Sequence, residues 1–251
     1  MNDPIDLNRY FSSGWDPGLP PLNLVRRRRQ RTLRIRIRDD VIIVSGPASV
    51  SRSRMMRFVG EKREWILKVC RRRMEKAGKL AEKRKQAEGT ILLRGIRKPL
   101  LDEPVPGLRK SGLTEREHDV IHRFNPDRDP DHALNDKRLI DTFYRQLAKK
   151  ELLERCDYWS VQLPFRPARI SIRNQRTKWG SCSARGTISL NWRLVKCPPD
   201  IIDYIIIHEL CHLRHFNHSK AFWETVRRCY PGVSEARAWI REHSDEIFAD
   251  F

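Results

Sequence analysis

The sequence lacks several features that would assign it to other classes of protein. No stretch approaches the roughly 18 successive apolar residues of a membrane-spanning helix, and no charged-then-apolar leader opens the chain. The six cysteines are scattered without a CxxC pair, which indicates reduced thiols and not a disulfide framework. We therefore expect a cytoplasmic protein that has no membrane partner.

Apolar residues are also scarce, at 39% of the 251 residues, but they are unevenly distributed. They concentrate after position 139, so the later part of the chain contains enough of them to form a hydrophobic core. The length allows one large domain or two modest ones.

Positive charge is abundant and lies mostly in the first 150 residues. The formal net charge is +19, and residues 1–150 contain 36 of the 51 Lys and Arg residues but 20 of the 32 Asp and Glu residues. Eight arginines lie in the segment from Arg26 to Arg38. The electrostatic field of so many positive charges attracts the phosphates of a nucleic acid or a nucleotide. Five of them are candidate nucleic-acid-binding residues: Arg26, Arg27, Arg28, Arg29 and Arg31.

The alternative interpretation of this run is that its arginines are merely solvated. Residues 33–38 alternate between apolar and basic types, as a half-buried strand does when its charged face meets water. No aromatic residue is interleaved with the arginines, so the run itself does not indicate a base-stacking surface. Both interpretations stay open at this point.

The pattern that points to chemistry is His-Glu-Leu-Cys-His at residues 208–212, followed six positions later by His218. In a helix, His208 and His212 lie one turn apart on the same face, about 5–6 Å between Cβ atoms, so both imidazoles can bind one zinc ion. Glu209 projects beside the metal, where it can accept a proton from a metal-bound water. His218 follows a predicted turn that returns it as a third ligand, and three protein ligands leave a position open for water.

Two weaker interpretations compete with this one. HExxH occurs by chance in helices, but here the preceding residues 200–207 are strongly apolar and follow Pro198-Pro199, a helix-start signal. Two histidines and a glutamate on a buried helix need partners for their polar atoms, and a bound metal ion supplies these partners. His215 is an alternative third ligand, although it lies earlier than a chain turning back would place one. Cys211 points away from the metal and is expected in the core.

The remaining patterns predict an α+β protein in four segments. Residues 1–23 are typical of a flexible leader, 24–101 of a basic α/β region, 102–135 of a loop or linker insertion, and 136–251 form the domain that carries the histidines. Besides the histidine helix, the predicted helices are 51–85, 136–163, 219–229 and 234–248, and the predicted strands are 31–38, 41–45, 90–94, 97–101, 168–173 and 187–191.

Motifs on both sides of the histidine helix add a family resemblance. The stretches Arg-Thr-Lys-Trp-Gly-Ser-Cys at 176–182 and Ile-Ser-Leu-Asn-Trp-Arg-Leu at 188–194 precede the helix, and Asn-His-Ser follows at 217–219. Together they resemble the YgjP-like metal-dependent hydrolase family, which is related to the SprT-like and WSS-type metalloproteases. The match is strong over roughly 140–246, and the basic hairpin with the helix after it also resembles the family's N-terminal region.

The resemblance implies a minimal zincin-like catalytic domain, in which the HExxH helix packs on a small antiparallel sheet. It implies His208, His212 and His218 as ligands of Zn²⁺ and Glu209 as the general base, in agreement with the spacing. The family's usual description is metallopeptidase, and a second description, nucleoside-triphosphate pyrophosphohydrolase acting on UTP, is also attached to members.

The two activities make different demands on the residues around the metal. A peptidase needs an edge strand for the polypeptide backbone, and residues 187–191 are predicted to supply it. A pyrophosphohydrolase needs cations that clamp the nucleotide, and Mg²⁺ is then the alternative metal. The candidate substrate-binding cations are Arg173, Arg176, Lys178, Arg185 and Arg193.

A third class of function is a non-catalytic nucleic-acid-binding protein that uses the metal only for stability. Structural zinc sites normally have four protein ligands and are closed, whereas Glu209 here stands in the position of a base. The sequence therefore favours a zinc-dependent hydrolase, with a peptidase ahead of a nucleotide pyrophosphohydrolase. It makes no prediction about the oligomeric state.

Overall fold

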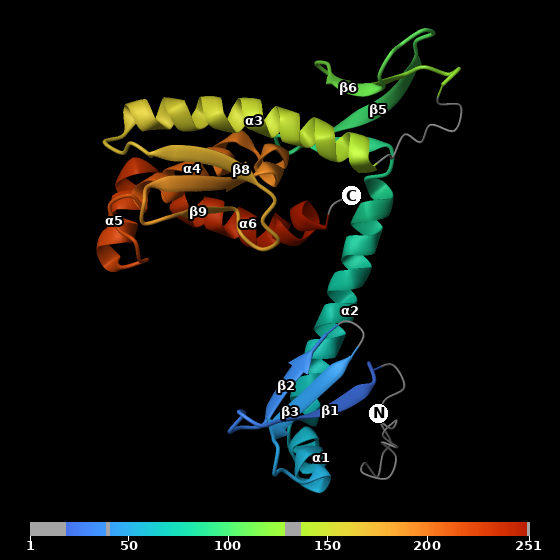
Figure 1. The fold of residues 1–251 in the computed structure, drawn as a ribbon, viewed down its shortest axis with the longest axis vertical. Coiled ribbons are helices and arrows are strands. Elements are labelled where there is room, and N and C mark those ends of the chain that lie inside the picture. Colours follow the sequence, from blue (N-terminus) through green and yellow to red (C-terminus); the bar gives the residue numbers. More distant parts are fainter. Residues whose placement is uncertain (1–18, 39–40, 129–136, 250–251) are drawn as a thin grey trace. The chain divides into compact units, whose positions relative to one another are not determined.

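The computed structural model describes residues 19–38, 41–128 and 137–249 (Figure 1). The chain divides into two compact units, Met1–Glu82 and Lys83–Phe251. Among the described residues, no helix is long and apolar enough to cross a membrane. All six cysteines are free thiols, as the scattered spacing predicts.

The first unit is a three-stranded sheet followed by helices. Its elements are β1 (Leu22–Arg27), β2 (Arg34–Ile37), β3 (Ile42–Pro47), α1 (Arg52–Glu61) and α2 (Arg63–Gln86), which extends past the unit's end. The strand order is β1-β3-β2, with β2 antiparallel and β1 parallel to β3. The predicted hairpin is therefore confirmed, although its turn at 39–40 lies outside the described residues. Strand β1 was not predicted, and it begins inside the segment assigned to the leader.

Alternation along these strands gives the first unit a small core on one face of the sheet. Ile42 and Val44 are fully buried and pack with Val59 and Ile66 of the helices. The Ser51 side chain caps α1 by accepting a hydrogen bond from the Arg54 amide. The single helix predicted from Ser51 is divided in two at Lys62.

The second unit opens with a four-stranded sheet in the order β4-β5-β7-β6. Its strands are β4 (Thr90–Leu93), β5 (Ile96–Pro104), β6 (Gly112–Glu115) and β7 (Val120–Phe124). The predicted strands 90–94 and 97–101 are confirmed. In the segment predicted as a loop, 102–135, the structure instead has the end of β5, β6 and β7. Residues 129–136 lie outside the described residues.

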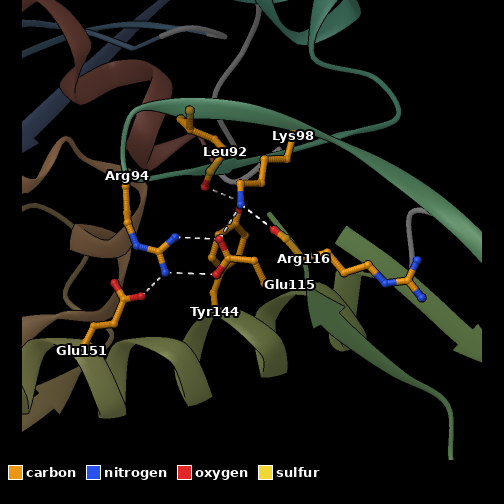
Figure 2. A network of polar contacts seen from close by, with 7 residues as sticks. All are labelled: Leu92, Arg94, Lys98, Glu115, Arg116, Tyr144 and Glu151. Carbon is orange, nitrogen blue, oxygen red and sulfur yellow. Dashed lines mark hydrogen bonds and ion pairs between the residues drawn. The ribbon is translucent and has the colours of Figure 1, made fainter. Parts of the chain in front are cut away.

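The turn between β4 and β5 joins this sheet to the rest of the unit through charged side chains (Figure 2). Arg94 has a φ of 47° in this turn, and its guanidinium donates to the carboxylates of Glu115 and Glu151. Lys98 donates to Glu115 Oε1 at 2.7 Å, and Tyr144 Oη donates to the Leu92 carbonyl at 3.1 Å. The pKa of Glu115 is lowered, chiefly by the hydrogen bond from Arg94.

This network predicts a stability change that depends on pH. We expect Glu115→Gln to lower the free energy of unfolding by about 1–3 kcal/mol at pH 7, because Arg94 and Lys98 lose a shared carboxylate while largely shielded from water. Since the pKa of Glu115 is lowered on folding, this contribution is present above the unfolded carboxyl pKa and is lost as the pH falls through the folded one.

Urea unfolding of the metal-free protein between pH 7 and pH 3 measures this difference. Glu117→Gln is the matched control, because the Glu117 side chain is 87% exposed and its partner His118 is 3.9 Å away. A difference between wild type and Glu115→Gln that does not change with pH would contradict the assignment.

The histidine-bearing part of the second unit is a mixed α+β assembly. Its strands are β8 (Arg169–Arg173), β9 (Gly180–Cys182) and β10 (Thr187–Asn191), and its helices are α3 (Lys137–Gln162), α4 (Pro199–Cys211), α5 (Lys220–Cys229), α6 (Val233–Phe248) and the 3₁₀ turn η1 (Trp192–Lys196). The sheet order is β8-β10-β9, in which β9 is antiparallel and β8 parallel to β10. The predicted α+β class is confirmed, with a sheet that is mixed and not wholly antiparallel.

Helix α4 is the central element of this core. Ile202, Ile206, Ile207 and Leu210 are fully buried, as the apolar run predicts, and α4 contacts α3, β9, α5 and α6. The helix begins at the predicted Pro198-Pro199 signal. Figure 1 shows α3 running along the sheet that contains β8. The histidines at the end of α4 are therefore held by a helix that is packed on several sides.

Candidate metal centre

Three histidines converge at the end of α4. His208 lies in the last turn of the helix, His212 caps it, and His218 precedes Ser219, the residue that caps α5. The ring centroids are 5.0 Å apart for His208 and His212, 5.2 Å for His208 and His218, and 4.8 Å for His212 and His218. One nitrogen from each ring lies within 4.8 Å of the others. The tertiary fold thus gathers the three residues that the sequence predicts as ligands.

His215 is oriented differently from these three. Its backbone oxygen accepts a hydrogen bond from His212 Nδ1 at 2.8 Å, and its ring Nε2 lies 3.2 Å from Thr225 Oγ1. The first contact leaves His212 Nε2 free for a metal and fixes the orientation of that ring. The second turns the His215 ring toward α5. His215 therefore positions a ligand and is not itself in the cluster.

The donor set fits a zinc ion. The His208 and His218 Nε2 atoms are 3.1 Å apart, close to the roughly 3.3–3.4 Å between two nitrogens bound to one tetrahedral ion at roughly 2.0–2.1 Å. Burial lowers the pKa of His208 to about 3, so its imidazole is neutral and able to act as a ligand near pH 7. Glu209 Oε2 is buried without a hydrogen-bond partner in the described structure. A buried oxygen of this kind usually has a partner, which a bound water molecule or ion would supply here.

Metal binding distinguishes the two candidate third ligands. We expect His218→Ala to weaken zinc affinity by more than about 100-fold, because it removes a ligand, and His215→Ala to weaken it by no more than about tenfold, because the backbone contact to His212 remains. Competition with a chromophoric chelator at fixed pH measures both. A larger loss in His215→Ala than in His218→Ala would reverse the assignment.

Glu209 is held against the edge strand β9. Its side chain is 6% exposed, and burial raises its pKa to about 7, while Lys178 acts in the opposite direction. A Cβ built on Gly180 of β9 would lie 2.7 Å from both Cγ and Oε1 of Glu209. The absence of a side chain at Gly180 therefore makes room for the carboxylate of Glu209. The raised pKa of this carboxyl suits it to accept a proton as a general base.

Aromatic side chains of α5 hold the ligand rings in place. Phe222 stacks on His212 with ring centroids 4.4 Å apart, and Trp223 stacks on His218 at 5.6 Å. The guanidinium of Arg237, on α6, lies 4.7 Å from the Trp223 ring centroid and contributes to the lowered pKa of His208. Sequence reasoning did not assign a functional role to these three residues, because only tertiary packing brings α5 and α6 to the histidines.

The predicted substrate-binding cations are placed differently from one another. Arg173, Arg176, Lys178 and Arg185 are exposed around β8 and β9, and of these Lys178 acts electrostatically on Glu209. Arg193 is 6% exposed, donates to Asn174 Oδ1 at 2.7 Å and lies 4.4 Å from the Trp192 ring centroid. These contacts hold its guanidinium within the fold.

The predicted edge strand is also placed differently. Residues 187–191 form β10, which is paired on both sides, by β8 and by β9. The prediction that this strand offers its edge to a peptide is therefore wrong. Among the described strands, β9 is the one that lies beside Glu209 and pairs along a single edge. It is only three residues long and gives no clear alternating signal in the sequence.

The predicted nucleic-acid-binding arginines belong to the first unit. Arg26 and Arg27 end β1, while Arg28, Arg29 and Arg31 lie between β1 and β2, and all five are exposed.

Comparison with known proteins identifies a family for most of the chain. A family model described as "YgjP-like, metallopeptidase domain" matches residues 31–243. Among solved structures, the metallopeptidase zymogen jannalysin of Methanocaldococcus jannaschii is 24% identical over 37% of this chain and 96% of its own, with a TM-score of 0.32. The zymogen abylysin of Pyrococcus abyssi is 28% identical over 37% of this chain and 90% of its own, with a TM-score of 0.30. A search of curated proteins finds no match.

Proposed function

Because the chain belongs to the YgjP-like family of metallopeptidase domains, we propose that it is a zinc-dependent peptidase whose metal is held by His208, His212 and His218. The observation that carries the proposal is the convergence of three imidazole nitrogens within 4.8 Å beside a buried carboxylate that has an unpartnered oxygen. A site built only for stability would close its coordination with a fourth protein ligand. Among the described residues, the His/Cys/Asp/Glu group at this place has three members.

The proposed chemistry assigns the proton transfers to Glu209. Bound zinc supplies Lewis acidity at the three histidines. Glu209 Oε2 accepts a proton from the attacking water and returns it to the amine that leaves as the C–N bond breaks, and burial, which raises the pKa of this carboxyl, favours the proton-accepting step. The burial that raises this pKa also excludes competing solvent. Arg237 adds positive charge near His208, where it counteracts the negative charge that develops on the carbonyl oxygen.

The proposed substrate is a polypeptide in extended conformation. Strand β9 pairs with β10 through one edge, and no strand of the described part of the chain pairs with its other edge, which is where we propose that a substrate strand is added. Gly180 in β9 touches Glu209, so a peptide paired with β9 has its backbone beside the base. Backbone pairing of this kind binds many sequences, and side-chain pockets then determine preference.

Nucleotide hydrolysis is the second candidate. The exposed Lys178, together with Arg173, Arg176 and Arg185, surrounds the strands that precede the metal helix and offers cations to a triphosphate. The peptidase is favoured, because Arg193 is engaged within the fold and because three imidazoles suit zinc better than Mg²⁺.

The test is to incubate zinc-loaded protein with unfolded casein and, separately, with UTP. We expect casein fragments that appear with zinc and disappear when a chelator is added. Mass spectrometry identifies the cleaved bonds, and a coupled assay measures pyrophosphate. If UTP releases pyrophosphate in a zinc-dependent reaction while casein stays intact, the proposed peptidase activity is wrong and nucleotide hydrolysis takes its place.

A further inference from the structure

Two hollows on the first unit meet at the edge strand β2. The first, which we call the basic hollow, has a volume of about 460 Å³ and is lined by five arginines: Arg27, Arg29, Arg31, Arg34 and Arg36. The second, the aromatic hollow, has a volume of about 600 Å³ and includes Ile35, Phe58, Lys62 and Trp65 in its lining. Arg34 and Arg36 line both, so the two hollows form one continuous surface.

The pairing of β2 with β3 explains why the arginines stand on one face. Arg34 pairs with Ser45 and Arg36 with Ile43, whereas Ile35 pairs with the fully buried Val44. Since successive side chains of a strand point to opposite faces, both arginines project away from the core. Strand β2 is at the edge of the sheet, so a ligand can pass from the arginine face around it.

The charge on this surface is of one sign. Residues 19–38 and 41–82 contain 19 Lys and Arg residues and 4 Asp and Glu residues. Neither hollow has a carboxylate in its described lining. Within the described part of the chain, no ion pair engages the arginines of the basic hollow. These cations are available to an external anion with several charges.

The aromatic hollow places aromatic side chains beside the arginines, whose own run in the sequence contains none. Phe58, Lys62 and Trp65 come from the junction of α1 and α2, and all three side chains line this hollow. The Trp65 side chain is 49% exposed although it is large and apolar. An exposed ring beside cations is the arrangement on which an unpaired base stacks while its phosphates are neutralised.

We propose that this surface binds single-stranded nucleic acid, with its phosphates on Arg34, Arg36 and the basic hollow, and with a base in the aromatic hollow against Trp65. A single strand is favoured over a duplex because a duplex keeps its base faces stacked inside and cannot present one to Trp65. This role is separate from the metal centre and does not depend on the proposed peptidase activity.

Fluorescence anisotropy with a labelled 15-nucleotide oligothymidylate and the intact, zinc-loaded protein tests the proposal. We expect Trp65→Leu to weaken binding about tenfold without changing its salt dependence, and Trp65→Phe to retain most of the affinity. In the double variant Arg34→Gln/Arg36→Gln, the slope of log affinity against log salt should become shallower by about 1.4, because two phosphate contacts are lost.

Matched controls come from the second unit. Tyr158→Leu removes an aromatic side chain that is 57% exposed, and Arg227→Gln/Arg241→Gln removes two exposed arginines. Both should bind like wild type, and circular dichroism confirms folding of every variant. The proposal is overturned if Trp65→Leu binds as tightly as wild type, if a duplex of equal length binds as tightly as the single strand, or if polyglutamate displaces the oligonucleotide equally well.

Discussion

Glu209→Gln is expected to lower the turnover number on a peptide substrate by about 10³-fold while zinc stays bound. The amide has the size of the carboxylate but cannot accept a proton, and removal of a general base typically costs about 10²–10⁴-fold. His208, His212 and His218 are unchanged, so zinc affinity should stay within about tenfold of wild type. Turnover and zinc content are measured on the same preparation, which separates loss of the base from loss of the metal.

The matched control for this prediction is Glu224→Gln. Glu224 is on α5, its side chain is 58% exposed, and its ion partner Lys220 is 3.9 Å away. Its replacement removes the same charge from a helix beside the metal and should leave turnover near that of wild type. A Glu209→Gln protein that is fully zinc-loaded and as active as wild type would exclude Glu209 as the base.

Gly180→Ala is expected to lower kcat/KM by about 100-fold or more without loss of zinc. The added methyl would lie 2.7 Å from Cγ and Oε1 of Glu209 and 2.9 Å from its Cδ, closer than packed atoms approach, so the carboxylate must move. A displacement of about 1 Å in a catalytic group costs about 10²-fold in rate. We expect a loss of stability of about 1–3 kcal/mol as well, because the site is closely packed.

Gly112→Ala is the control for this substitution. Gly112 is in β6 of the same unit, and a Cβ built there has no heavy atom within 4 Å. Steady-state kinetics and zinc content of both variants complete the comparison. If Gly180→Ala and Gly112→Ala had equal kcat/KM, Glu209 would have room to relax, and the close approach to β9 would have no role in catalysis.

Much of the metal centre could be predicted from the sequence because its information is local. A helix brings residues four apart to the same face, so the positions of His208 and His212 follow from the apolar run before them. His218 follows a short turn, and Ser219 caps α5 at the start of the helix predicted over 219–229. The spacing of the three histidines in the sequence is therefore enough to predict that they come together as ligands.

The surroundings of the base could not be predicted because they depend on tertiary packing. Gly180 reaches Glu209 only after β9 pairs with β10, and three residues are too short for a strand pattern. Arg237 reaches the site from α6, about 30 positions along the chain from the histidine helix. Strand β7 was missed for a related reason, since Val120, Ile121 and the neighbouring His122 are all buried and do not alternate.

The first unit shows the same division between local and tertiary information. The alternation of residues 33–38 predicts β2 and its exposed arginines, and the structure has both. The aromatic partner of these arginines is on a helix that starts about 30 residues later, so Trp65 is adjacent to Arg34 only in the fold. The fold therefore places an exposed aromatic ring beside arginines whose own run in the sequence contains no aromatic residue.

Anomalous scattering at the zinc edge, from crystals of the zinc-loaded protein, tests the central claim most directly. We predict one peak per chain, bound by one nitrogen each of His208, His212 and His218 at roughly 2.0–2.1 Å, with a fourth position open to solvent beside Glu209. No peak at saturating zinc, a peak bound by His215 in place of His218, or a fourth protein ligand that closes the site would contradict the account.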